Sequence, residues 1–167
     1  MNLVFDRAWQ HALELHRHDR YGLHEYRFHL SNVVAELDAI RANLPTRIAA
    51  VFHDAIEGGH ITRDELARQY GDEVAGIVWS VSHEGGNRRE QARCIVAKLE
   101  LMPTAIDVKL SDRKSNMQTS LKEGNARLFS MYLKEVDVYE SVFSQGHPVL
   151  YAGYRALCER PLPRPAV

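Results

Sequence analysis

The stretch Ile48–Glu57, IAAVFHDAIE, decides the fold and the site that this sequence predicts. Its first five residues are apolar and leave no polar face, which is typical of a helix surrounded by other helices. His53 and Asp54 follow at once, and Glu57 comes one helical turn after His53. Ionisable side chains inside such a helix are costly unless something compensates them, and a metal ion is the commonest compensation for adjacent His and Asp. We therefore expect other parts of the chain to supply further ligands.

The composition indicates a single domain without a dominant charge. At 167 residues and 45% apolar content, the chain is long enough for one sizeable core and too short for two packed domains. Its 21 basic and 22 acidic residues nearly cancel, and no apolar run approaches the roughly 18 residues of a membrane span, so neither nucleic acid nor a membrane is an expected partner. Cys94 and Cys158 have no paired-ligand spacing and are expected to be buried in a reducing cytosol. We expect a cytoplasmic protein that acts on a small molecule; the sequence leaves a homo-oligomer open.

Helical periodicity runs through the whole chain. Apolar residues recur every three or four positions, whereas no strand-like alternation exceeds a few residues. The pattern predicts an all-α fold, a single helical bundle over residues 1–160 with a frayed tail over residues 161–167. The expected helices cover about residues 3–17, 26–40, 45–57, 62–70, 73–83, 92–102, 104–119, 125–143 and 148–159.

Two other side chains are candidates to join His53 and Asp54 around a metal. His29 lies on the apolar stripe of its helix, although alone it is more simply explained as a hydrogen-bonded core histidine. Asp112 lies on the helix over residues 104–119, with Asn116 one turn later on the same face. Together the four potential ligands offer two imidazoles and two carboxylates, which suits Mn²⁺, Fe²⁺ or Zn²⁺ and leaves positions open for water and substrate. The alternative is a buried His53–Asp54 hydrogen-bonded pair and a solvated Asp112.

These residues and their spacing resemble the HD-domain metal-dependent phosphohydrolases. The segments HRHDR, EYRFH, AAVFHDAIE, YGDEVAGIV and VKLSDRKSNM follow one another in the family's order between about residues 8 and 121. The pair HD alone is a weak signal, whereas HDAIE followed at this distance by KLSDRxxN is specific. Within the family, the sequence looks most like the hydrolase domain of the RelA/SpoT alarmone enzymes and their small single-domain relatives of the MESH1 type.

The resemblance implies a compact bundle of helices around a metal, usually manganese. The metal ligands that it implies are His29, His53, Asp54 and Asp112. It also implies that Glu57 positions or deprotonates the attacking water and that Asn116 contacts the substrate near the scissile phosphate. Arg17 and Arg20 lie in the basic segment that such enzymes use for nucleotide phosphates, where this chain has a shorter turn. The alternatives are a solvated Glu57 at a helix C-terminus, against the helix dipole, and a surface amide at Asn116.

The chain departs from the family at Gly58, where the usual HDxxED pattern has an aspartate. A lost carboxylate beside Glu57 is expected to lower activity, to alter proton handling or to shift the substrate. The first functional hypothesis is a hydrolase that removes the 3′-diphosphate of (p)ppGpp or a related nucleotide, with metal-activated water attacking phosphorus. The second is an HD phosphatase acting on another nucleotide or phosphate ester. The third is a nucleotide-binding sensor that keeps Arg17, Arg20 and Asn116 in use but turns over poorly.

Overall fold

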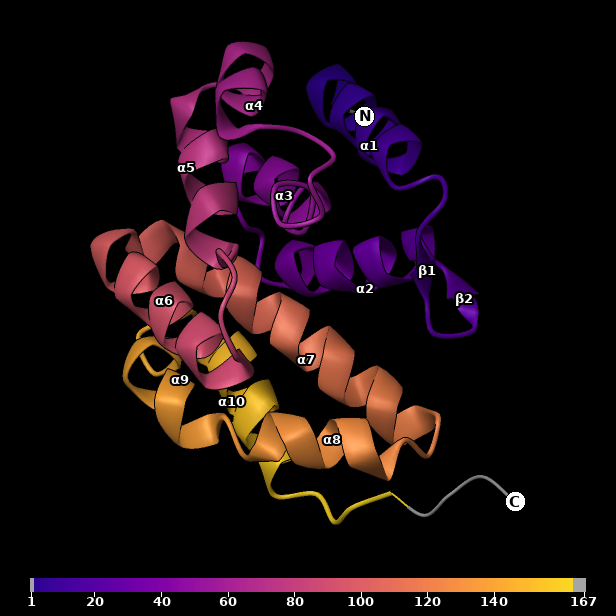
Figure 1. The fold of residues 1–167 in the computed structure, drawn as a ribbon, viewed down its shortest axis with the longest axis vertical. Coiled ribbons are helices and arrows are strands. Elements are labelled where there is room, and N and C mark those ends of the chain that lie inside the picture. The colour runs from indigo at the N-terminus through magenta and orange to yellow at the C-terminus, as the bar shows by residue number, and fades with distance from the viewer. Residues whose placement is uncertain (1, 164–167) are drawn as a thin grey trace.

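Helices make up nearly all the regular structure of the chain (Figure 1). A computed structural model describes residues 2–163. Its helices are α1 (Leu3–Leu15), α2 (Tyr26–Ala39), α3 (Leu44–Val51), α4 (Arg63–Tyr70), α5 (Asp72–Val81), α6 (Arg88–Leu101), α7 (Ile106–Lys122), α8 (Ala126–Leu133), α9 (Val136–Phe143) and α10 (Pro148–Cys158), with a 3-10 turn, η1 (Pro103–Ala105), before α7. The prediction of an all-α fold is confirmed.

Helix α7 is the axis of the fold, because most of the other helices pack against it. In Figure 1, α2 and α3 lie above α7, and α8, α9 and α10 lie below it. Because neighbours surround this helix, its charged residues are buried together with its apolar ones. The buried charged residues of α7 are Lys109, Asp112, Arg113 and Lys114. Each of them therefore needs an oppositely charged partner inside the fold.

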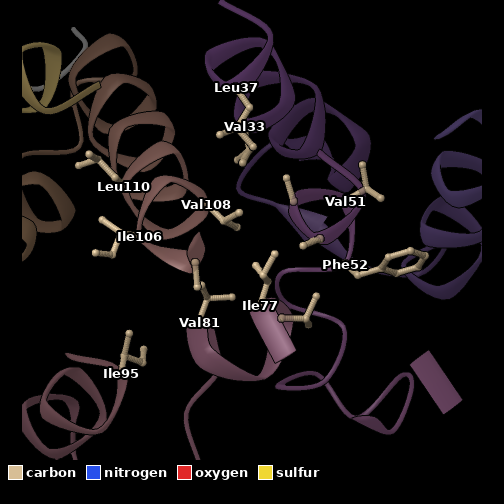
Figure 2. Close-up of a cluster of buried hydrophobic side chains, with 14 of the residues drawn as sticks. Val33, Leu37, Val51, Phe52, Ile77, Val81, Ile95, Ile106, Val108 and Leu110 are labelled. Atoms are coloured by element: carbon tan, nitrogen blue, oxygen red, sulfur yellow. The ribbon is translucent and has the colours of Figure 1, made fainter. Parts of the chain in front are cut away.

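The core between α2, α3, α5 and α7 fixes the positions of the segments that carry the predicted ligands (Figure 2). Its members shown there include Val33, Leu37, Val51, Phe52, Ile77, Val81, Ile106, Val108 and Leu110, all of them buried. Burying one side chain of this size stabilises the fold by about 1.5–3 kcal/mol. The segments that carry His29, His53 and Asp112 are therefore anchored by their own apolar neighbours.

The helix predicted over residues 45–57 ends earlier than expected. α3 stops at Val51, and consecutive turns follow over residues 52–59. Phe52 leaves helical geometry with φ −106° and ψ 6°, and His53 Nδ1 donates to the carbonyl oxygen of Ala50 at 2.7 Å. The last carbonyls of a helix lack intrahelical partners, so the His53 ring helps to satisfy this helix end. The prediction that the ionisable residues of IAAVFHDAIE lie inside a helix is wrong; they lie just beyond its C-terminus.

The helix predicted over residues 125–143 is two helices, because α8 ends at Leu133 and α9 begins at Val136. Between them lies Glu135, which is only 8% exposed and accepts a hydrogen bond from Arg113 Nη1 at 2.6 Å. Neither glycine nor proline marks this break. A buried ion pair, which periodicity does not reveal, fills the space at the turn.

A small hairpin also departs from the helical pattern. β1 (Arg20–Tyr21) pairs antiparallel with β2 (His24–Glu25), and Gly22 in the turn has φ +59°. Glycine adopts this left-handed conformation without steric cost. The hairpin connects α1 to α2 and thereby places Tyr21 beside His29, with ring centroids 4.4 Å apart.

The remaining expectations concern the tail, the cysteines and the membrane. Residues 161–163 have no regular structure, and residues 164–167 of the predicted tail lie outside the described residues. Cys94 and Cys158 are free, as expected, but partly exposed rather than buried. Within residues 2–163, none of the helices is long and apolar enough to cross a bilayer.

Candidate metal centre and its cavity

The four predicted metal ligands converge from three parts of the fold. His29 Nε2, on α2, lies 3.1 Å from His53 Nε2 and 3.3 Å from Asp112 Oδ1 on α7. His53 Nε2 lies 3.1 Å from Asp54 Oδ2 and 3.6 Å from Asp112 Oδ1. Two ligands of a tetrahedral ion with bonds of about 2.0–2.1 Å are about 3.3 Å apart. The spacing of the His29, His53 and Asp54 atoms therefore fits a bound divalent metal, and Asp112 lies within 3.6 Å of both imidazoles.

Contacts on the far side of each imidazole turn its Nε2 toward the centre. His53 Nδ1 must carry the proton that it donates to the carbonyl oxygen of Ala50, because a carbonyl only accepts. His29 Nδ1 lies 3.3 Å from the hydroxyl oxygen of Ser115. Histidine ligands of metals are usually oriented by such a partner on the second nitrogen. Each ring is therefore held ready to offer Nε2 as a ligand.

The charges at the centre favour a cation. Burial alone would lower the pKa of His53, but the carboxylates of Asp54 and Asp112 raise it to about 10. Burial would likewise raise the pKa of Asp54, yet the adjacent His53 holds it below the usual range of a carboxyl group. Without a metal, the two carboxylates thus retain a proton on His53 in place of a positive ion. A metal that binds here has to displace that proton.

Asp112 is held in place by its own helix. Lys109 Nζ lies 3.0 Å from Asp112 Oδ2, and Asn116 Nδ2 donates to Asp112 Oδ1 at 2.5 Å. Although burial raises the pKa of the Asp112 carboxyl, Lys109 and the two imidazoles lower it well below its usual value. Tyr21 donates its hydroxyl hydrogen to Asn116 Oδ1 at 2.6 Å. Asn116 therefore bridges the hairpin and Asp112.

A cavity of about 170 Å³ opens beside the four ligands, and Glu57 and Asn116 line it. The carboxylate of Glu57 is bound at both oxygens by His83, through the ring nitrogen Nε2 at 2.9 Å and the backbone nitrogen at 3.2 Å. His83 lies where α5 gives way to the loop before α6. The predicted catalytic residues and three of the predicted metal ligands, His29, Asp54 and Asp112, thus line one cavity.

Three positive side chains that line the same cavity were not predicted from the sequence. They are Arg88, Lys109 and Arg113. Arg113 is 4% exposed and shares the carboxylate of Glu135 with Arg88, whose Nη2 lies 3.2 Å from Oε2. The motif KLSDR contains Lys109 and Arg113, three residues before and one residue after Asp112. Lys109, one helical turn from Asp112, is the residue that the sequence could have indicated as a neighbour of that carboxylate.

The arginines predicted to bind phosphates lie elsewhere. Arg17 is exposed and pairs with Glu14 at 2.8 Å, and Arg20 donates to the carbonyl oxygen of Leu23 at 2.8 Å. Neither residue is among those that line the cavity beside the metal ligands. The structure therefore brings His29, His53, Asp54, Glu57, Asp112 and Asn116 together but leaves Arg17 and Arg20 outside.

Comparison with known proteins identifies the class: residues 8–141 match the HD domain family, and the chain belongs to this family. It is 31% identical over 119 residues to the guanosine-3′,5′-bis(diphosphate) 3′-pyrophosphohydrolase of Aquifex aeolicus (strain VF5), covering 68% of this chain and 17% of the relative. It is 29% identical over 117 residues to a probable GTP pyrophosphokinase of Mycobacterium leprae (strain TN), covering 66% and 14%. The chain thus spans less than a fifth of either relative's length.

A solved structure shares the whole fold. It is described as a metazoan ortholog of SpoT that hydrolyzes ppGpp and plays a role in starvation responses. The TM-score is 0.80 at 17% sequence identity, and the superposition covers 94% of both chains. The resemblance to HD-domain alarmone enzymes predicted from the sequence motifs is confirmed.

Proposed function

We propose that this protein is a metal-dependent hydrolase that removes the 3′-diphosphate of (p)ppGpp or a related nucleotide. The observation that carries the proposal is the convergence of two imidazoles and two carboxylates beside a cavity that is also lined by two arginines and a lysine. A relative named for this 3′-pyrophosphohydrolase activity is 31% identical to the chain over 119 residues, and the HD domain match over residues 8–141 includes all four ligands. The proposed partner is therefore a nucleotide rather than nucleic acid or a membrane, and the proposed location is the cytoplasm.

The metal in this proposal is held by His29, His53, Asp54 and Asp112. Mn²⁺ is the first choice, with Zn²⁺ and Fe²⁺ as alternatives, because nitrogen and oxygen ligands in equal number suit all three ions. When bound, such an ion supplies Lewis acidity toward water and toward a phosphoryl oxygen. The proton on His53 is lost on binding, so the imidazole is neutral in the loaded enzyme.

The protein's own residues then handle protons and phosphates. Water adds to the phosphorus of the 3′-diphosphate, the bond to the ribose 3′ oxygen breaks, and diphosphate leaves while that oxygen takes up a proton. Glu57 accepts the proton of the attacking water, and its two contacts with His83 fix the direction in which its oxygens point. Asn116 has a second amide hydrogen, beyond the one bound to Asp112, for a substrate oxygen.

The substrate phosphates are assigned to the basic side chains that line the cavity, Arg88, Lys109 and Arg113. Arg88 is the most accessible of the three, with a side chain 47% exposed, and guanidinium groups bind phosphate oxygens in pairs. Lys109 and Arg113 add charge from deeper positions. Arg17 and Arg20, which the sequence motif suggests for this task, remain a second assignment at the rim formed by α1 and the hairpin.

One substrate panel tests the proposed function. The metal-loaded protein is incubated with ppGpp, pppGpp, NADPH and nucleoside monophosphates, and the release of phosphate and of diphosphate is followed separately. Diphosphate from ppGpp or pppGpp is the expected result. Release of phosphate alone from other esters would instead show an HD phosphatase, and tight binding of ppGpp without turnover would show a sensor, the outcome that Gly58 in place of aspartate makes relevant.

A further inference from the structure

A second group of ligand-type side chains lies apart from the four ligands of the first centre. His16 follows the last residue of α1, Asp19 lies in the turn before β1, and His60 lies in the loop before α4. Asp19 Oδ2 is 2.7 Å from His16 Nδ1 and 2.8 Å from His60 Nε2. One ligand atom from each of the three residues lies within 4.8 Å of the other two. Segments that are 41 residues apart in sequence are thus brought together at one carboxylate.

The cavity at this group suits a cation. It has a volume of about 280 Å³ and is lined by His16, Asp19, His60 and, in addition, Tyr26, Asp54, Glu57 and Gly58. Three carboxylates therefore face it, whereas its lining, within residues 2–163, contains neither lysine nor arginine. An anion would meet three carboxylates here, while a dication would lower the repulsion among them.

His16 is incompletely satisfied in its present contacts. The residue is only 4% exposed, and its Nε2 is a buried nitrogen without a hydrogen-bond partner in the described part of the chain. Buried polar atoms rarely lack a partner, and those that do call for an explanation such as a ligand. His16 thus lies beside Asp19 and His60 with one ring nitrogen bound to Asp19 and the other without a protein partner in the described part of the chain.

Gly58 makes room for the third member of the group. A Cβ atom at residue 58 would lie 2.7 Å from Cδ2 and 2.8 Å from Nε2 of His60, too close for either atom to stay where it is. A side chain at residue 58 would therefore push the His60 ring from its present position, in which Nε2 contacts Asp19. The position where the chain departs from its family pattern is thus the position that admits this imidazole.

We propose that His16, Asp19 and His60 form a second metal site, which takes a transition-metal dication of the zinc class. Two imidazoles and one carboxylate are a recurrent ligand set for such ions, with the remaining positions filled by water. Tetrahedral ligands with bonds near 2.1 Å are about 3.4 Å apart, so the three side chains must separate by about 0.6 Å when the ion enters. Asp19 and His60 lie in turns and loops, with side chains 35% and 25% exposed, and have the freedom to do so.

Metal stoichiometry tests this second site independently of any activity. The full chain is stripped with a chelator, equilibrated with Zn²⁺, freed of loose ions by gel filtration and analysed for metal per chain; Co²⁺ absorption repeats the measurement. Wild-type protein is expected to bind two ions. His60→Ala and Asp19→Asn are each expected to bind one, and Gly58→Ala is expected to do the same because its methyl group displaces the ring of His60.

Two controls separate the sites. His18→Gln removes an exposed imidazole that contacts Arg17 and lies two residues from His16 in sequence. This variant should still bind two ions per chain. His53→Ala should lose the first ion and keep the second. Circular dichroism checks that each variant folds; if His60→Ala does not, Asp19→Asn and Gly58→Ala decide. A single ion in the wild type that His53→Ala removes, or two ions retained in the folded variants of the second site, would show that the group is a hydrogen-bonded cluster and overturn the proposal; a single ion that His60→Ala removes would instead count against the first centre.

Discussion

Replacing Lys109 with methionine should destabilise the metal-free protein far more than the metal-loaded protein. Methionine keeps the length and apolar stem of the lysine but removes its charge. Lys109 is buried in α7, and its Nζ lies 3.0 Å from Asp112 Oδ2. Without the lysine, the Asp112 carboxylate stays buried but loses the positive charge of Lys109, the neighbouring charge that most lowers its pKa. A bound metal supplies positive charge at the same carboxylate, so it should replace part of the lost interaction.

The expected size follows from the geometry. Two unit charges 3.0 Å apart attract by about 5 kcal/mol at an effective dielectric constant of about 20. Removing the lysine also removes the cost of burying it, and measured losses for breaking one buried pair are about 3–5 kcal/mol. At about 2–4 °C per kcal/mol for a chain of this length, a loss of about 3 kcal/mol lowers Tm by about 6–12 °C.

Thermal unfolding followed by circular dichroism, with EDTA and with excess Mn²⁺, measures both states. Lys114→Met is the matched control, because Lys114 is also buried in α7 and pairs with Glu36 at 2.6 Å, but it is not among the residues that line the metal cavity. Lys114→Met should lower Tm by a similar amount in both conditions. Equal gains in Tm on metal binding by wild type and Lys109→Met, or a metal-free loss under about 2 °C, would refute the assigned electrostatics.

Three further predictions concern the same centre. Metal uptake at this centre at pH 7.5 should release about one proton per ion from His53, whose pKa is about 10 without metal, so metal affinity should rise with pH up to that value. Calorimetry in buffers of different ionisation enthalpy measures the number of protons released, and zero release would contradict the prediction. Glu57→Gln should keep the metal while turnover falls by about 10²–10⁴-fold, since the amide cannot accept the proton; an unchanged kcat would remove Glu57 from the mechanism. Arg88→Met should raise KM for ppGpp about 10-fold to 100-fold, as expected for the loss of one charge-assisted bond of about 1.5–3 kcal/mol, and should leave the metal content unchanged. A larger rise in KM for Arg17→Met would assign phosphate binding to the arginines suggested by the motif instead.

The sequence predicted which side chains converge better than it predicted the backbone that carries them. His29 shares an apolar stripe with Val33 and Leu37, so helical periodicity alone predicted that its side chain is buried. The position of Asp112 on α7 was predicted from the same periodicity. The end of α3 could not be predicted in this way, because the chain leaves the helix at Phe52, six residues before the glycine that seemed to end it. The apolar run continues across that turn. Such a run indicates that the residues are buried, and it does not show that they are helical.

Long-range ion pairs were beyond prediction for a different reason. Arg88 and Arg113 meet at Glu135, three residues on three different segments, and no local pattern links them. The basic cluster near residue 17 was conspicuous in the sequence because its members are neighbours. Proximity in sequence thus did not reveal which basic residues line the cavity, since a cavity wall is assembled from residues that lie far apart along the chain.

The meaning of Gly58 changes once its surroundings are considered. In the related HDxxED pattern a carboxylate follows the glutamate, and its loss suggested weaker negative charge beside Glu57. The structure instead shows the ring of His60 where a Cβ at residue 58 would collide, and Asp19 bound to that ring. Asp19, Asp54 and Glu57 all face the same cavity, so the neighbourhood of Glu57 keeps its negative charge. In the proposed mechanism, Asp19 therefore offers a carboxylate on a cavity that Glu57 also lines, which favours retained turnover over a sensor.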